Sequence, residues 1–266
     1  MSEVKLARSD AVTWLRTLPT ASVDLVITDP PYESLEKHRA IGTTTRLKVS
    51  KASSNAWFDI FPNARFPELF AEIYRVLKPN THFYLFSDPE TAFVAKPMAE
   101  AAGFKFWKPL IWDKKSIGMG YHYRSRYEFV LFFEKGKRRL RDLARADVLS
   151  VPRIRNGYPT EKPVELAEIL VRQSATAGQL VVDPFMGSGS FGVAAIREGC
   201  RFWGNDIAEQ SLAHAGGRFP SAHPPERTFE GAQMEIGERS GSSTLTETSA
   251  SYLFDAVVAS ASGMPK

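Results

Sequence analysis

Seven short runs of apolar and β-branched residues recur along the chain and predict β-strands. They cover residues 4–6, 23–28, 81–87, 106–112, 127–133, 179–183 and 201–206. Several of them, such as VDLVIT at 23–28, are apolar almost throughout. That composition is expected of strands that are covered on both faces of a sheet.

Helical spacing of apolar positions appears between these runs, and six helices are predicted from it. They cover residues 10–18, 66–77, 91–102, 163–175, 190–199 and 208–219. Strands that alternate with helices predict an α/β fold with a mostly parallel, seven-stranded sheet and helices on both faces. The runs at 106–112 and 127–133 leave little room for a crossover helix, so we expect one antiparallel strand there.

Two segments fall outside this alternation. Residues 33–60 form a long polar stretch with five Lys or Arg residues, and a loop of that length is usually functional or disordered. Residues 221–266 are rich in Ser, Thr and Glu, with 3 basic and 6 acidic residues, which favours a disordered or loosely packed tail. We therefore expect one folded domain over residues 1–220.

Composition excludes several classes of protein. A hydrophobic share of 43% excludes wholesale disorder, and the single Cys200 excludes an internal disulfide framework and a clustered-cysteine zinc site. No run approaches the roughly 20 apolar residues of a membrane span. The first residues also lack the apolar core of a signal peptide, so we expect a cytoplasmic protein without membrane partners.

Basic charge is concentrated in the middle of the chain. The formal net charge is +4, but residues 105–155 hold 14 Lys or Arg against 5 Asp or Glu, interleaved with Trp107, Tyr121 and Tyr123. Such a surplus favours a phosphate-backbone partner. A solvated basic face explains the same charges equally well.

The tetrapeptide Asp29-Pro30-Pro31-Tyr32 directly follows the apolar run at 23–28. Two prolines cannot continue a strand, so the chain turns out at the carboxyl end, where ligands of α/β sheets bind. The Asp29 carboxylate and the Pro30 carbonyl are acceptors, and Tyr32 is a stacking ring. Together they suit a planar group that bears an NH2; the alternative is a capped turn with a packed tyrosine.

A glycine-rich turn, Asp183-Pro184-Phe185-Met186-Gly187-Ser188-Gly189, ends another predicted strand and opens a helix. Gly187 and Gly189 allow the backbone to approach a ligand closely, whereas a Walker loop is excluded because G-K-[ST] is missing. Asp206 ends the next strand, 23 residues after Asp183, a spacing typical of a carboxylate that binds ribose hydroxyls. A purely structural turn remains the alternative.

Two further motifs allow two interpretations each. Thr160 stands just ahead of a predicted helix and is a candidate N-cap, while Lys162 is a candidate partner of a ligand carboxylate. Asp10 is an N-cap of the helix at 10–18 or an acceptor for an adenine amine.

Taken together, these four motifs resemble the β group of amino DNA methyltransferases, over roughly residues 4–215. The resemblance implies a Rossmann-like fold and S-adenosyl-L-methionine as cofactor. It gives the catalytic role to Asp29, Pro30, Pro31 and Tyr32. The implied cofactor-binding residues are Asp10, Asp29, Thr160, Lys162, Asp183, Phe185, Gly187, Ser188, Gly189 and Asp206; no metal is implied.

The chain departs from the family at two places. Tyr158 stands where the motif around Thr160 commonly begins with His, and the region for target recognition is short, at residues 137–157. The loop at 33–60 is expected to share that duty on double-stranded DNA. The candidate phosphate contacts are Arg39, Arg46, Lys48, Lys51, Arg124, Arg126, Lys137, Arg138 and Arg139. Homodimers are common in the family, but the sequence shows no interface.

The expected reaction is methylation of adenine N6 in a flipped base of duplex DNA. Adenine is preferred because cytosine-N4 members mostly have Ser where this chain has Asp29. Cytosine N4 as the target and an inactive DNA-binding relative stay as alternatives, and the glycine spacing disfavours a nicotinamide dehydrogenase. All of this requires that the loops at Asp29 and Gly187 open into one cavity.

Overall fold

The computed structural model describes residues 3–219 except 35–58, 119–121, 156 and 159. Within these residues lies one eight-stranded sheet in the order β1-β8-β7-β2-β3-β5-β4-β6. The strands are β1 Val4–Arg8, β2 Val23–Thr28, β3 Leu77–Ser87, β4 Lys105–Asp113, β5 Tyr127–Lys135, β6 Val148–Ser150, β7 Leu180–Asp183 and β8 Arg201–Asp206.

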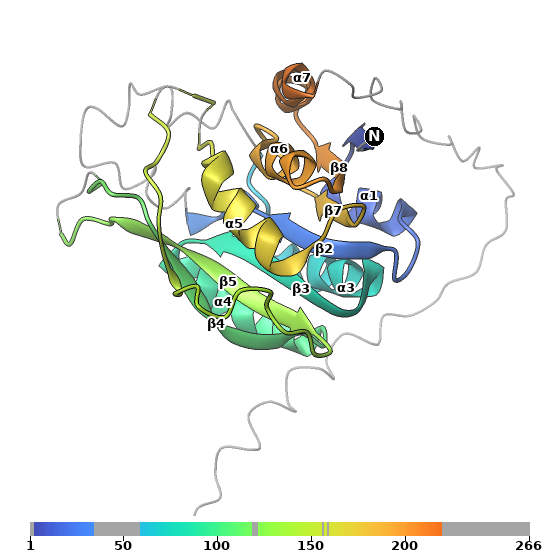
Figure 1. Cartoon of the computed structure of the whole chain (residues 1–266), viewed down its shortest axis with the longest axis horizontal. Helices are drawn as coiled ribbons and strands as arrows, with labels where there is room; N and C mark the ends of the chain where they lie inside the picture. The colour runs from blue at the N-terminus through green and yellow to red at the C-terminus, as the bar shows by residue number, and fades with distance from the viewer. Residues whose placement is uncertain (1–2, 35–58, 119–121, 156, 159, 220–266) are drawn as a thin grey trace, which may run out of the picture. The chain divides into compact units, whose positions relative to one another are not determined.

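Seven helical elements connect the described strands. They are α1 Ala11–Thr17, the 3-10 helix η2 Asn63–Arg65, α3 Phe66–Val76, α4 Pro89–Ala101, α5 Val164–Ser174, α6 Ser190–Arg197 and α7 Glu209–Arg218. Figure 1 shows α5 and α6 in front of the sheet and α3 and α4 behind it. No helix among the described residues is long and apolar enough to span a membrane.

The strands are apolar on both faces because each face is covered by helices. In β2, Leu25 and Ile27 pack into a core with side chains of α5, α6 and α7, whereas Val26 packs into a second core with α1, α3 and α4. The predicted two-sided α/β sheet is thereby confirmed. Burial on both faces also explains why this strand is an unbroken apolar run rather than an alternating one.

The predicted antiparallel strand is β5, which runs antiparallel to both of its neighbours, β3 and β4. The count of seven strands was wrong by one, because β6 pairs in parallel with the outer edge of β4. This strand has only three residues, with Leu149 buried between exposed Val148 and Ser150. So short a run carries no detectable periodicity, and it lies within the segment 137–157 that was assigned to target recognition.

Topology sets the place of the candidate site. β2 lies parallel to both β3 and β7, and β7 lies parallel to β8. β3, β5, β4 and β6 lie on one side of β2, and β8 and β1 lie on the other side of β7. The segments that follow β2 and β7 therefore leave the carboxyl ends of two neighbouring strands side by side, at the point where ligands bind in open α/β sheets.

Candidate active site

The loop after β2 and the glycine turn after β7 line one cavity of about 750 Å³. Asp29, Pro30, Pro31 and Tyr32 stand on one side of it, with Phe185 and Gly187 on the other. The volume is within the range of roughly 300–1,000 Å³ that is usual for small-molecule sites. The requirement that both loops share one cavity is met.

Asp29 is held on both of its oxygens. Tyr32 donates its hydroxyl hydrogen to Oδ1, and the Lys162 ammonium donates to Oδ2. Burial raises the pKa of Asp29 above its ordinary value, and Lys162 opposes that rise. Burial also raises the pKa of Tyr32, so this phenol is a neutral donor. The turn thus presents a carboxylate in a fixed orientation.

Lys162 connects Asp29 to a second carboxylate that sequence reasoning missed. Its Nζ lies 3.5 Å from Oε2 of Glu128, and Oε1 of Glu128 accepts from Nζ of Lys114 at 3.1 Å. Asp29 and Glu128 raise the pKa of Lys162 against the effect of burial, so the ammonium stays charged. The structure places Lys162 against Asp29, and its predicted contact with a cofactor carboxylate remains a prediction.

A signal for Glu128 existed in the sequence. It is an acidic residue near the start of β5, and the five positions that follow it, Phe129–Phe133, are all apolar. A charged side chain there needs a buried partner, because an unpaired buried charge is costly. The partner, however, comes from a segment more than thirty residues away, and the spacing of residues gives no indication of it.

The glycine turn is fixed by Asp206. Its Oδ2 accepts from the Gly187 amide at 2.9 Å and its Oδ1 from the Ala208 amide at 2.9 Å, while the residue lines the cavity. Gly187 has a φ of 48°, which disfavours a side chain. Ser188 lines a smaller adjoining pocket with Gly187.

Gly189 and Asp183 support the turn from beneath and do not line the cavity. Gly189 is the N-cap of α6, and a Cβ there would lie 3.1 Å from the side chains of Ala215 and Phe219. Asp183 is fully buried, and its Oδ1 accepts from Thr28 Oγ1 at 2.7 Å and from the Phe185 amide at 3.0 Å. Its second oxygen has no partner among the described residues, and burial raises its pKa to about 8.

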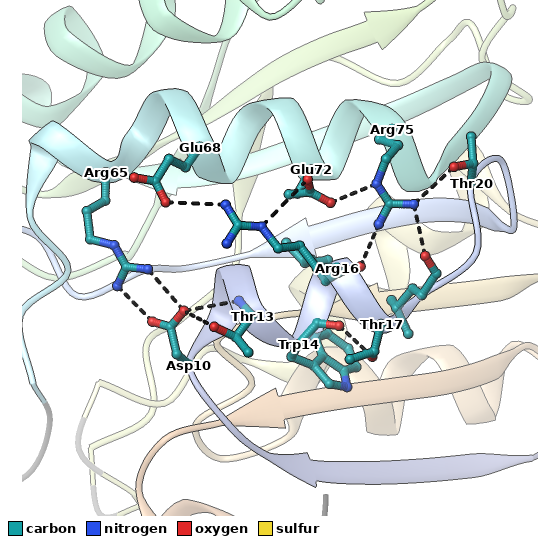
Figure 2. A network of polar contacts seen from close by, with 12 residues as sticks. Asp10, Thr13, Trp14, Arg16, Thr17, Thr20, Arg65, Glu68, Glu72 and Arg75 are labelled. Carbon is teal, nitrogen blue, oxygen red and sulfur yellow. Dashed lines mark hydrogen bonds and ion pairs between the residues drawn. The ribbon is translucent and has the colours of Figure 1, made fainter. Parts of the chain in front are cut away.

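Asp10 fulfils the capping role and also lines the cavity. It accepts from the Thr13 amide at 3.1 Å, so it is the N-cap of α1. Figure 2 shows the Arg65 guanidinium reaching across to the same carboxylate, at 2.7 and 3.0 Å. The hydrogen bonds from Arg65 hold the pKa of Asp10 at about 2. The role toward an adenine amine remains a prediction.

Arg65 was not anticipated from the sequence. Its guanidinium carbon lies 5.1 Å from the ring centroid of Phe61, which in turn meets Phe185 edge-on at 5.0 Å. The same face of α3 carries Glu68 and Glu72, between which Arg16 of α1 reaches at 3.7 and 3.9 Å (Figure 2). The contacts of Arg16 join α1 to α3. Arg65, Phe61 and Phe185 form an aromatic and charged wall of the cavity.

Thr160 does not cap the following helix, and this expectation was wrong. The N-cap of α5 is Pro163, without a side-chain hydrogen bond, and Thr160 has a φ of 61°. The chain therefore turns at Thr160, before the helix starts, and this turn places Lys162 beside Asp29. Thr160 still lines the cavity, as does Tyr158, whose hydroxyl pairs with Ser211 Oγ at 2.9 Å.

The basic residues that flank β5 and were predicted to contact DNA lie at its two ends. Arg124 and Arg126 alternate with Ser125 and Tyr127, which line the cavity. Lys137, Arg138 and Arg139 follow the other end of β5, where Lys135 pairs with Thr81 of β3. The 9 residues of β5 carry the chain about 27 Å, at about 3.4 Å per residue.

Trp107 lies toward that far end as well, where its indole donates to Glu134 at 2.9 Å. Arg153, which sequence reasoning missed, lines the cavity at the near end. The predicted phosphate-binding face of Arg124, Arg126, Lys137, Arg138 and Arg139 would extend along the whole of β5, and contact of these residues with DNA remains a prediction.

Several predictions lie outside the described residues. These are the contacts of Arg39, Arg46, Lys48 and Lys51 within the loop at 33–60, and the nature of the tail at 221–266. Among the residues that the structure does describe, no group of three or more His, Cys, Asp or Glu side chains is placed to hold a metal ion.

Comparison with known proteins gives a consistent picture. A family model described as DNA methylase matches residues 23–215. DNA adenine methyltransferase YhdJ of Escherichia coli K12 is 27% identical over an alignment 285 positions long with its gaps, which covers 91% of this chain and 92% of YhdJ.

Two solved structures share the fold. The DNA modification methylase TTHA0409 from Thermus thermophilus, solved with S-adenosyl-L-methionine, has a TM-score of 0.61 and 24% identity, covering 81% of this chain and 92% of its own. The cytosine-N4-specific PvuII DNA methyltransferase has a TM-score of 0.64 and 18% identity, covering 82% and 87%.

Proposed function

Because the chain belongs to the DNA methylase family of N6 and N4 methyltransferases, we propose that it transfers a methyl group from S-adenosyl-L-methionine to the exocyclic N6 of adenine in duplex DNA. The single observation that carries this proposal is the cavity shared by Asp29 and the glycine turn at Gly187. A donor site and an acceptor site must open into one space for a group to pass between them.

The residues of the cavity fit this cofactor. Phe61, Phe185 and Ile207 provide apolar walls for a base, and the carboxylates of Asp10 and Asp206 provide acceptors for its amine and for ribose hydroxyls. A Cβ at Gly187 would lie 3.8 Å from the Tyr158 ring. The glycine therefore keeps the space between the turn and this ring open to a ligand. S-adenosyl-L-methionine supplies an electrophilic methyl group on a positively charged sulfur.

The chain's own residues orient the acceptor amine. The Pro31 carbonyl is used by the Phe61 amide at 2.9 Å, whereas no donor among the described residues contacts the Pro30 carbonyl. Asp29 and the Pro30 carbonyl would accept the two amine hydrogens, which directs the nitrogen lone pair into the cavity. Alignment and fixed dipoles of this kind lower the barrier without a covalent intermediate.

The target base must leave the duplex to reach Asp29. Flipping costs a few kcal/mol, and stacking on an aromatic ring returns about 1–3 kcal/mol. We assign that stacking to Tyr32, whose hydroxyl is held by Asp29 at the cavity wall. The ring is therefore fixed before the base arrives.

Adenine is proposed over cytosine because Asp29 begins the tetrapeptide and because YhdJ is an adenine enzyme. The same acceptors suit cytosine N4, which the PvuII enzyme modifies. DNA treated with the protein and labelled cofactor, then digested to nucleosides, is expected to yield N6-methyladenine by mass spectrometry. N4-methylcytosine would overturn the adenine assignment, and no labelled nucleoside would favour the inactive DNA-binding relative.

Phosphate contacts are expected at the cavity rim and not at the far end of β5. Replacing Arg124 and Arg153 together with glutamine should lower DNA affinity severalfold and reduce the slope of log affinity against log salt by up to about 2. Fluorescence anisotropy with duplex DNA at several salt concentrations measures both quantities.

The matched control replaces Lys137 and Arg139 with glutamine, which removes the same charge from the far end. That variant should bind like the unmodified protein. A larger loss from the far-end pair than from the rim pair would place the DNA on the opposite edge of the sheet and contradict this docking.

A further inference from the structure

Four alternating charges form a row along the wall of the cavity. Asp29 is followed by Lys162, then by Glu128, and Lys114 stands outermost. All four line the cavity, and the Lys162 side chain is only 9% exposed. The row is neutral as a whole, so no charge in it is left without a partner.

Asp29 and Glu128 compete for the Lys162 ammonium. An ammonium is a compact point charge with three donors, which is free to settle between the two oxygens of a single carboxylate. Lys162 does not do so here, because Glu128 attracts it from the other side at 3.5 Å. Its contact is with Oδ2 of Asp29 alone, and Oδ1 is left to the Tyr32 hydroxyl.

Oδ1 faces a neutral hydroxyl and Oδ2 faces an ammonium, so Oδ1 keeps more of its negative charge and is the better acceptor for a further donor. A carboxylate offers about four lone-pair sites, and one neutral hydroxyl occupies only one of the two on Oδ1. Glu128 is itself fixed from behind by Lys114, 3.1 Å from its Oε1, and by its place in β5 opposite Trp112. Glu128, which restrains Lys162, is thus itself held in place by the sheet.

We propose that Glu128 is a positioning residue: it holds the Lys162 ammonium on one oxygen of Asp29, so that the other oxygen stays available to the target amine. This inference rests on the proposed methyl transfer, in which Asp29 accepts a hydrogen of that amine. Glu128 itself touches neither Asp29 nor, in this role, the reacting atoms. It positions Asp29 through Lys162.

The first test is Glu128→Gln, which keeps the shape and removes the charge. Lys162 then moves fully onto Asp29, so kcat should fall by about tenfold to a hundredfold, the cost of a small misplacement of reacting groups. The KM for DNA and the Kd for S-adenosyl-L-methionine should change by less than about twofold. Glu100→Gln, which breaks an exposed pair with Lys96 on α4, is the control and should leave all three unchanged.

The pH profile separates positioning from a merely structural role. Glu128 helps to raise the pKa of Asp29, so its removal lets Lys162 lower that pKa and moves the acidic limb of kcat to lower pH. Lys114→Gln should act in the opposite direction: without Lys114, Glu128 attracts Lys162 more strongly, and the acidic limb moves to higher pH. Glu128→Asp keeps the charge and should keep the limb in place while kcat falls.

The titration of Asp29 can also be followed without turnover, by carboxyl 13C NMR with Asp29→Asn to assign the signal. The proposal expects opposite shifts in Glu128→Gln and Lys114→Gln, and Lys114→Gln decides the matter if Glu128→Gln does not fold. A shift of the Asp29 pKa in the same direction in both variants, or no shift in either, would overturn the positioning role of Glu128. A protein that transfers no methyl group to DNA but shows both shifts would instead refute the proposed function and retain the role of Glu128.

Discussion

Replacing Asp29 with asparagine is expected to lower the rate of methyl transfer to DNA by about 10²- to 10³-fold or more, the usual cost of removing one fixed polar group that acts in the transition state. Asparagine is nearly isosteric, but it lacks the negative charge that strengthens a hydrogen bond to an amine. Its NH2 group would also repel the amine hydrogens. Single-turnover transfer from labelled cofactor measures the effect.

Cofactor binding should survive this change. In the variant, Lys162 still has Glu128 at 3.5 Å, so no buried charge is left alone, and the glycine turn is fixed by Asp206 rather than by Asp29. The Kd for S-adenosyl-L-methionine, measured by calorimetry, should therefore stay within about threefold. Asp147→Asn, which breaks an exposed pair with Lys108, serves as the control.

Loss of activity and of cofactor affinity together would contradict the catalytic role of Asp29. It would indicate that the carboxylate supports the cavity as a scaffold, through Lys162 and Tyr32. Near-normal activity in Asp29→Asn would point to another acceptor in the cavity.

The positions of strands and helices could be predicted from the sequence, because they depend on the local spacing of apolar residues. The apolar runs at 23–28 and 201–206 match β2 and β8 residue for residue. The expected reaction required one cavity shared by the loops at Asp29 and Gly187. The pairing of β2 with β7 brings the two loops together, and Asp29, Gly187 and Asp206 all line the cavity.

Side-chain partnerships were not accessible in this way. Lys162 contacts Asp29 and Glu128, whose charges raise its pKa, and the spacing of residues identified neither partner. Arg65 meets Asp10 across 55 positions of the chain, between two helices whose contact no spacing predicts. Lys137 lies far from Arg126 because an extended strand separates neighbours in sequence faster than any other element does.

The second large effect is expected on the pH dependence of the free energy of unfolding, through Asp183. Its carboxyl has a pKa of about 8 in the folded protein, raised by burial from an ordinary value of 3.8, so the folded state binds the proton more tightly than the unfolded chain. Raising the pH from about 4 to about 8 must then cost stability, at up to about 1.4 kcal/mol per pH unit, and the loss levels off above the folded pKa.

Asp183→Asn removes this dependence, because asparagine does not titrate and its side-chain oxygen can still accept from Thr28 and the Phe185 amide. The free energy of unfolding is measured in urea at pH 5, 6, 7 and 8, without cofactor. As the pH rises, the free energy of unfolding of the variant, relative to that of the unmodified protein, should increase by a few kcal/mol. The difference between the two curves isolates Asp183 from Asp29 and Asp206, whose raised pKa values are common to both. Parallel curves from pH 5 to 8 would mean that Asp183 is already ionised in the folded state, and that a partner for its second oxygen stabilises the charge.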